Sequence, residues 1–191
     1  MGKVTNVLLV GVGGQGTIMV STVLTHGLIE AGYDVKMSEV HGMAQRGGSV
    51  TTQVRFGETV YSPIIGRGQG DVLTAFETME ALRILEALKP DGKVIVNDYR
   101  IPPMPVIAGE APYPEGLIGI LQKAADTSVI DAASIAGKLG NTKVMNVVLL
   151  GALLKVLNLA EIDWESILKR VIKPQFFDVN LQALRAGMAA V

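Results

Sequence analysis

Hydrophobic residues recur along the chain in short runs, separated by longer stretches with helical spacing. Short runs bounded by glycine or proline predict buried strands, and the longer amphipathic or apolar stretches predict helices. Strands are expected at residues 6–10, 35–39, 71–75, 93–97 and 127–131. Helices are expected at residues 15–31, 78–88, 116–125, 132–139, 141–157, 163–171 and 178–186. This alternation predicts an α/β fold, a single doubly wound and mostly parallel sheet of the Rossmann-like type with helices on both faces.

Two segments depart from this alternation. Residues 49–56 alternate between the two faces of a strand and are rich in β-branched side chains, and Gly57 and Glu58 form a turn signal before residues 59–61. This pattern predicts an antiparallel hairpin inserted into the sheet. Between Ile101 and Pro114 the chain carries five of its eight prolines, which disfavours helix and predicts extended segments or a wrapping loop.

Composition narrows the class of protein. The 191 residues are 49% hydrophobic, enough for one compact domain spanning 1–191, with no linker that argues for a second. The formal net charge of -1 gives no electrostatic argument for nucleic acid and little protection against association with other chains.

Cysteine is absent, so this chain cannot hold an iron–sulfur cluster by itself. His26 and His41 are the two histidines, and their spacing makes a zinc site improbable; no metal site is expected. No targeting segment is expected, and the apolar stretch 144–157 is too short to cross a bilayer, which needs roughly 20 residues. We interpret that stretch as a buried helix of a cytoplasmic protein.

The first candidate site is the glycine motif that follows the first strand. Gly11, Gly13 and Gly16 satisfy the spacing G-x-G-x-x-G, with Gly14 and Gln15 in the turn. In that motif the first glycine permits a tight turn, the second lets the backbone approach a phosphate, and the third lets the helix pack closely against the strand. The amides that open the helix would then face an anion. The alternative is a turn that only joins the strand to the helix.

A second candidate site follows the next strand. Glu39 closes that strand about 20 residues further on, the position of a ribose-binding acid in dinucleotide-binding folds. The segment after it has little apolar content to bury and is expected to serve a site; its candidate binding residues are His41, Gln45, Arg46, Gly47 and Gly48. In the alternative interpretation Arg46 pairs with a carboxylate and the two glycines start a hairpin.

Four further polar residues are candidates by position. Arg67 and Gln69, in a second glycine-rich loop, are expected at the carboxyl side of the sheet with Asn97, where open α/β sheets bind ligands. Asn146, inside an apolar helix, is most simply a buried amide with its hydrogen bonds satisfied, although a contact with the glycine loop is an alternative.

The two glycine-containing motifs, residues 11–16 and 39–48, resemble the gamma-type subunit or domain of the 2-oxoacid:ferredoxin oxidoreductases. The second motif is most similar to the small, or beta, subunit of the indolepyruvate branch. The resemblance extends through residues 66–71, 77–88 and 141–151, so it covers nearly the whole chain.

The resemblance implies a subunit of a complex that decarboxylates an aryl 2-oxoacid such as indolepyruvate, forms an arylacetyl-CoA and passes electrons to ferredoxin. It places thiamine diphosphate, magnesium and [4Fe–4S] clusters on a larger partner subunit, because this chain lacks both cysteine and the Gly-Asp-Gly thiamine motif. The role left for this chain is to complete the active-site cleft and to hold coenzyme A. No catalytic residue is assigned, and the isolated chain is expected to be inactive.

Two other classes of function remain open on the residues alone. The glycine motif with Glu39, taken literally, indicates an NAD(P)-dependent dehydrogenase, although the chain has no substrate domain and no obvious acid–base pair. A non-catalytic nucleotide-binding or scaffold module, whose glycine loops only pack, is the third interpretation. Reduction of NAD by the purified chain would favour the dehydrogenase, and failure to bind any nucleotide would favour the scaffold.

Overall fold

The fold is built on one six-stranded sheet. The computed structural model describes residues 3–42 and 47–191. The strands are β1 (Thr5–Val12), β2 (Asp34–His41), β3 (Ser49–Gly57), β4 (Gly70–Ala75), β5 (Leu88–Asn97) and β6 (Asp126–Ile130), in the spatial order β2-β3-β1-β4-β5-β6. The four strands β1, β4, β5 and β6, neighbours in this order, are parallel to one another. Strand β3 runs antiparallel to both β1 and β2.

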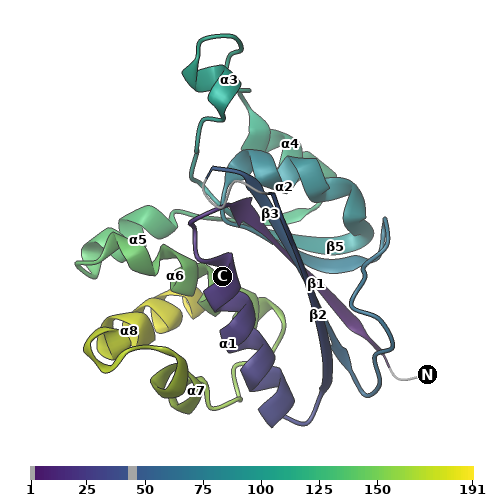
Figure 1. The fold of residues 1–191 in the computed structure, drawn as a ribbon, viewed down its shortest axis with the longest axis vertical. Coiled ribbons are helices and arrows are strands. Elements are labelled where there is room, and N and C mark those ends of the chain that lie inside the picture. The colour runs from purple at the N-terminus through teal and green to yellow at the C-terminus, as the bar shows by residue number, and fades with distance from the viewer. Residues whose placement is uncertain (1–2, 43–46) are drawn as a thin grey trace.

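Helices cover both faces of this sheet (Figure 1). They are α1 (Thr17–Glu30), α2 (Thr78–Ile84), α3 (Met104–Ile107), α4 (Leu117–Ala124), α5 (Ala132–Lys138), α6 (Met145–Val156), α7 (Trp164–Val171) and α8 (Phe177–Met188). Because side chains alternate along a strand, Val7 and Leu9 of β1 join one core while Leu8 and Val10 join the other. The predicted α/β class, with its mostly parallel sheet and two helical layers, is therefore confirmed.

The larger core lies between the sheet and α1, α5, α6, α7 and α8, and the smaller one between the sheet and α2 and α4. Within the larger core, α6 and α8 approach until backbone meets backbone. A Cβ at Gly151 would overlap the carbonyl oxygen of Leu184, and one at Gly187 would overlap that of Val148. The long apolar stretch of the sequence is thus a helix buried on nearly every side.

The hairpin predicted between residues 49–56 and 59–61 does not form. Residues 59–61 are not a strand. Since β3 lies between β1 and β2, both of its edges are already paired, and β2 is its hairpin partner. The chain after β3 is held differently, by a hydrogen bond from the amide of Val60 to the Asp34 carboxylate at 2.7 Å.

Two other expectations about local structure were wrong. The helix predicted to reach Leu88 ends at Ile84, continues as a 3₁₀ turn over Leu85–Ala87, and gives way to β5. The proline-rich segment does contain a short helix, α3, in which Pro105 lies in the first turn, where its fixed φ is compatible with helix. In the described ranges, 3–42 and 47–191, no helix is long and apolar enough to cross a membrane.

Candidate functional site

The glycine turn connects β1 to α1 at the carboxyl end of the sheet. Gly14 and Gly16 have positive φ values of 101° and 82°, and Gly16 is the N-cap of α1. No hydrogen-bond partner for the amides of Gly14 and Gly16 is present among the described residues. Because unpaired amides at a helix N-terminus favour negative charge, this part of the turn can receive an anion.

Gln15 closes the turn from inside. Its Oε1 accepts from the amide of Val12 at 2.7 Å, and its Nε2 donates to the carbonyl oxygen of Phe76 at 2.8 Å. Gly11 makes room for this side chain, since a Cβ there would lie 2.8 Å from Oε1. Gln15 therefore joins the ends of β1 and β4, and both polar atoms of its side-chain amide have a hydrogen-bond partner in the protein.

Gly16, the third glycine of the motif, allows close packing between α1 and α6, whereas the motif predicts close packing between α1 and β1. A Cβ at Gly16 would overlap the side-chain amide of Asn146 in α6, so Gly16 lets α1 approach α6 rather than β1. The Nδ2 of Asn146 lies 3.4 Å from the carbonyl oxygen of Gly16, and its Oδ1 accepts from the amide of Val147 at 2.9 Å. The contact between Asn146 and the glycine loop, which was the alternative interpretation of this residue, is present.

A cavity of about 540 Å³ opens on the α6 side of the glycine turn. It lies where β1, β4 and β5 end, at the crevice where open α/β sheets bind ligands. Asn97, the last residue of β5, lines it and bridges Phe76 to the start of α5. Its lining residues are Gly13, Gly14, Gln15, Gly16, Phe76, Asn97, Tyr99, Ile101, Thr142, Lys143, Met145, Asn146 and Leu149.

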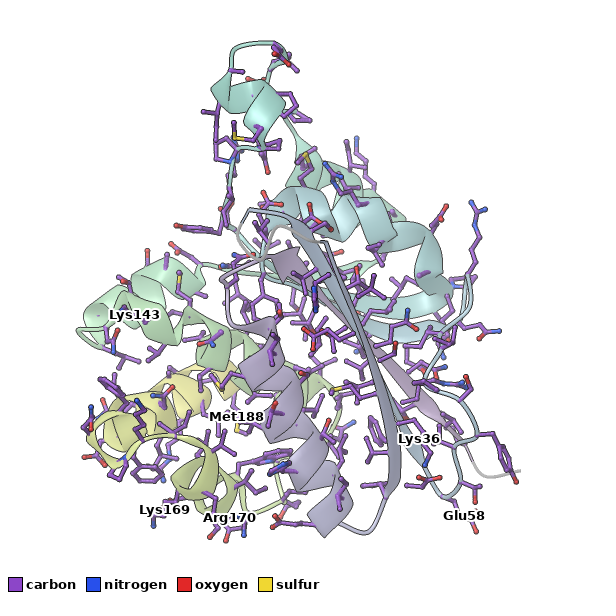
Figure 2. All side chains as sticks on the ribbon, viewed as in Figure 1. Lys36, Glu58, Lys143, Lys169, Arg170 and Met188 are labelled. Atoms are coloured by element: carbon purple, nitrogen blue, oxygen red, sulfur yellow. The ribbon has the colours of Figure 1, made fainter. Side chains whose placement is uncertain are left out.

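Lys143 is the one ionised side chain among the described residues that line this cavity. It lies in the turn just before α6 (Figure 2). The sequence interpretation missed it because exposed lysines are common, and nothing in the local pattern places this one opposite a glycine turn far away in the chain.

A second cavity, of about 370 Å³, opens on the opposite side of the same turn. Its lining includes three glycines of the turn together with Thr17, Ile18, Glu39, His41 and Val50. The Oε1 atom of Glu39 is buried and has no hydrogen-bond partner among the described residues. A buried carboxylate oxygen without a donor is costly, so this atom fits a ligand hydroxyl or amide that supplies one.

The loop after Glu39 lies against the glycine turn. The amide of Gly13 donates to the carbonyl oxygen of Gly48 at 2.8 Å, and that of Gly47, with φ of 78°, donates back to Gly13 at 3.4 Å. His41 ends β2, and its exposed ring lines the second cavity. Gln45 and Arg46 lie outside the described residues.

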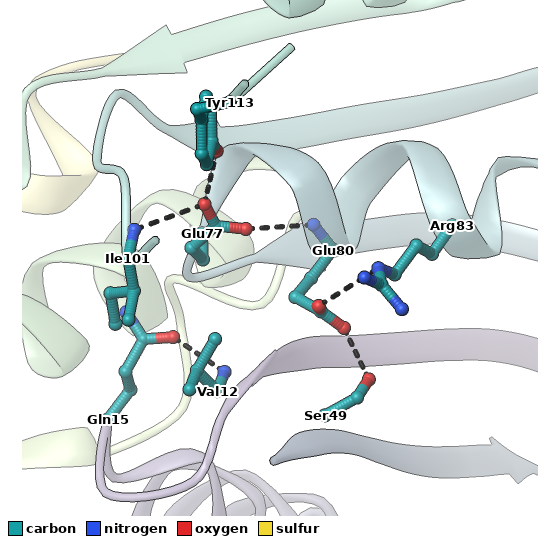
Figure 3. Close-up of polar contacts among 8 residues, drawn as sticks. All are labelled: Val12, Gln15, Ser49, Glu77, Glu80, Arg83, Ile101 and Tyr113. Atoms are coloured by element: carbon teal, nitrogen blue, oxygen red, sulfur yellow. Dashed lines mark hydrogen bonds and ion pairs between the residues drawn. The ribbon is translucent and has the colours of Figure 1, made fainter. Parts of the chain in front are cut away.

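Two carboxylates of α2 fix the surroundings of this turn (Figure 3). Glu80 accepts a hydrogen bond from the Ser49 hydroxyl and pairs with Arg83 at 3.3 Å, which holds the start of β3. Glu77 caps the helix by accepting from the amide of Glu80 at 2.9 Å. Glu77 is fully buried.

The other oxygen of Glu77 accepts from the amide of Ile101 at 3.3 Å and from the Tyr113 hydroxyl. Burial raises the pKa of Tyr113, and the neighbouring Glu77 carboxylate raises it further. The hydroxyl therefore keeps its proton and stays a donor. Glu80 therefore connects α2 to the start of β3, and Glu77 connects it to the segment that contains Ile101 and Tyr113.

The second glycine-rich loop does not join the site. Arg67 and Gln69 precede β4, so they lie at the amino end of the sheet, opposite the glycine turn. Arg67 pairs with Glu86 at 2.7 Å, and the carbonyl oxygen of Gln69 accepts from the side chain of Asn6 at 2.8 Å. The expectation that they lie beside Asn97 was wrong, because a loop that enters a parallel strand lies at its amino end.

Comparison with known proteins assigns the fold and the two motifs to one family. The family model described as pyruvate ferredoxin/flavodoxin oxidoreductase matches residues 6–190. The chain belongs to this family. It is 38% identical to the indolepyruvate oxidoreductase subunit IorB of Thermococcus kodakarensis, over 98% of this chain and 96% of that protein.

Two solved oxidoreductase structures have the same fold. The pyruvate oxidoreductase subunit PORC of Thermotoga maritima superposes with a TM-score of 0.75 at 24% identity, covering 98% of this chain and 96% of that chain. The 2-oxoglutarate:ferredoxin oxidoreductase of Magnetococcus marinus, solved with 2-oxoglutarate, coenzyme A and succinyl-CoA bound, gives 0.75 at 20% identity. The match covers 98% of this chain but 31% of the Magnetococcus chain, so there the fold is one part of a longer polypeptide.

Proposed function

We propose that this chain is the small subunit of an indolepyruvate-type 2-oxoacid:ferredoxin oxidoreductase. The observation that carries the proposal is the 38% identity to subunit IorB over nearly the full length of both proteins. In the overall reaction an aryl 2-oxoacid loses its carboxyl group as CO₂, and its acyl carbon forms a thioester with the sulfur of coenzyme A. Two electrons pass to ferredoxin, and the thiol proton is released.

The residues of this chain do not fit thiamine diphosphate or an iron–sulfur cluster. Clusters need thiolate ligands, and the chain has no cysteine. A Gly-Asp-Gly thiamine motif is also absent from the sequence. Thiamine diphosphate, magnesium and [4Fe–4S] clusters therefore belong to a larger partner subunit, and the complex passes its electrons to ferredoxin in the cytoplasm.

Coenzyme A fits the residues around the glycine turn. The amides of Gly14 and Gly16 would receive an anionic phosphate of the coenzyme, and Lys143 would add positive charge from the opposite wall. The buried Oε1 of Glu39 would accept a hydrogen bond from a ribose hydroxyl. In this proposal His41, Gln45, Arg46, Gly47 and Gly48 border the same ligand, while Gly11, Gly13 and Gln15 hold the turn in shape.

Reconstitution tests the function. The chain is produced alone and together with the large subunit from its own host, and indolepyruvate-dependent ferredoxin reduction is measured with coenzyme A and thiamine diphosphate supplied. We expect activity from the complex and none from the single chain, with a higher kcat/KM for indolepyruvate than for pyruvate or 2-oxoglutarate. Activity of the single chain, or a complex that prefers pyruvate, would contradict the proposal.

The dehydrogenase alternative is favoured by the position of Glu39 beside the turn and is tested in the same preparations. Saturable NAD(P) binding by the isolated chain, together with indolepyruvate-independent NAD(P) reduction, would replace the proposed function.

A further inference from the structure

The segment between β5 and α4 extends from the body of the molecule and carries α3 at its tip (Figure 1). None of residues 101–116 is buried, and the side chains of Met104 and Ile107 are 72% and 66% exposed. Between Ile101 and Pro114 the one charged residue is Glu110. Contiguous exposed apolar surface on a protein marks interaction sites.

The segment is fixed at its base, although Met104 and Ile107 at its tip are exposed and belong to neither of the two cores of the described residues. Glu77 holds Ile101 on one side and Tyr113 on the other, and the Arg100 guanidinium lies 5.5 Å from the centre of the Tyr113 ring. The carbonyl oxygen of Tyr99 accepts from the amide of Thr78 at 3.0 Å. Four prolines, Pro102, Pro103, Pro105 and Pro112, restrict the chain between Ile101 and Tyr113.

A fixed base and proline-restricted backbone reduce the entropy lost when the segment binds a partner. A four-residue helix gains little stability by itself, so α3 has no evident role within this chain alone. Loops beyond about 12–15 residues in a compact domain are usually functional.

We propose that residues 99–113 form a docking arm that binds the large subunit of the complex through the apolar side chains of Met104 and Ile107. The inference rests on the proposed function. Tyr99 and Ile101, at the base of the arm, line the 540 Å³ cavity beside the glycine turn. Any chain that brings thiamine and clusters to this cavity must lie over its rim, where the arm begins.

Two further observations favour the large subunit as the occupant. In the Magnetococcus protein the matching fold is 31% of a longer chain, so there the same fold is covalently joined to additional polypeptide. The arm also continues the wall of the cavity, whereas Tyr61, which is 83% exposed, lies beyond the end of β3 and lines a different cavity. The arm therefore reaches a partner that completes the site.

The absence of cysteine allows a direct test, because Met104→Cys and Tyr61→Cys each give this chain a single thiol. Maleimide labelling of this chain is followed by mass spectrometry, for the free chain and for the purified complex. Both thiols should react at similar rates in the free chain. In the complex, the labelling rate of the thiol at position 104 should fall by at least about tenfold, as expected for a buried interface residue. The labelling rate at position 61 should be unchanged.

A second variant tests the energy of the contact. Ile107→Asp should weaken association with the large subunit by about thirtyfold or more, the effect of losing a central apolar anchor. Its melting temperature should equal that of the unmodified chain, because Ile107 packs against no core residue. Tyr61→Asp is the matched control and should associate normally.

Equal labelling of position 104 in free chain and complex, or unchanged association of Ile107→Asp, would overturn the docking arm while indolepyruvate activity of the unmodified complex still supports the proposed function. Protection of position 104 in the isolated chain that grows with its concentration would assign the arm to a second copy instead. If the unmodified chain binds no large subunit, both proposals fail.

Discussion

The amide of Gly13 donates to the carbonyl oxygen of Gly48 at 2.8 Å, and this bond joins the two glycine motifs. The N–H of the glycine that the motif places closest to a phosphate is therefore already used inside the chain. The amides left for an anion are those of Gly14 and Gly16. The bond also places the loop that follows Glu39 against the turn, and both motifs border the second cavity.

The unpaired Oε1 of Glu39 gives the first prediction. We expect Glu39→Gln to weaken coenzyme A binding to the complex about tenfold, because a hydrogen bond to a carboxylate contributes about 1.5–3 kcal/mol and one to a neutral amide oxygen about 0.5–1.5 kcal/mol. Its melting temperature should stay unchanged or rise, since the buried carboxylate oxygen has no donor among the described residues. Calorimetric titration and thermal unfolding measure the two effects.

The matched control for this carboxylate is Glu58→Gln, at a distant end of the molecule (Figure 2). It should change neither quantity. A fall in stability of Glu39→Gln with unchanged coenzyme affinity would make Glu39 a structural residue.

Lys143 gives the second prediction. Lys143→Ala should raise the KM for coenzyme A several-fold in the complex, with a larger effect at low ionic strength, because the loss is electrostatic and screened by salt. Lys155→Ala, at the other end of α6, is the control and should leave the KM unchanged. Equal KM values for the two variants at low salt would remove Lys143 from the site.

Much of the fold could be predicted from the sequence, because strand and helix periodicity are local properties. The alternation in residues 49–56 identified β3, yet not its neighbours. Which strand pairs with β3 depends on its place inside the sheet, between β1 and β2. The loop carrying Arg67 was placed at the wrong end for a different reason: it precedes β4, and a loop that enters a parallel strand lies at the amino end of the sheet.

The site was predictable where a motif is continuous in sequence and was missed where it is assembled in space. The spacing of the glycines indicated the turn, and the separation in sequence between the turn and Glu39 indicated a residue that lines the second cavity. Lys143 and Tyr99 reach the cavity only through the packing of α6 and the end of β5. Glu77 was overlooked because Thr78, the more usual capping residue, stands next to it.

Two glycine-to-alanine substitutions should have opposite effects on stability, one where α6 and α8 approach closely and one on an open part of α5. Gly187→Ala should destabilise the chain by about 2 kcal/mol or more, because its Cβ would overlap the backbone of Val148. Gly137→Ala, in α5, meets no atom within 4 Å and should stabilise by about 0.5–1 kcal/mol. Denaturant unfolding measures both, and a neutral Gly187→Ala would contradict this helix packing.

Asp131, the N-cap residue of α5, gives a pH-dependent prediction. The hydroxyl and the amide of Ser134 donate to its carboxylate, which lowers the pKa of Asp131 below its usual value of 3.8. A lowered pKa in the folded state stabilises the fold above the unfolded pKa, and this contribution is lost as the pH falls through the folded pKa. The melting-temperature difference between the unmodified chain and Asp131→Ala should therefore be constant near neutral pH and shrink below about pH 4.

Asp131→Asn is the control for that experiment, because asparagine caps a helix without titrating. The difference in melting temperature between Asp131→Asn and Asp131→Ala should stay the same across the pH range. A constant difference for the unmodified chain as well would show that the Asp131 cap does not depend on ionisation.

Gly16 and Asn146 give the last prediction, which separates backbone strain from side-chain overlap. Gly14 and Gly16 both have positive φ, but a Cβ at Gly14 meets nothing within 4 Å, whereas one at Gly16 overlaps Asn146. Gly14→Ala should therefore cost about 1–2 kcal/mol from strain alone, and Gly16→Ala should cost more. Adding Asn146→Ala to Gly16→Ala should recover about 1 kcal/mol relative to additivity. If the double variant is simply additive, the third glycine of the motif is needed for its φ and not for the approach of α6.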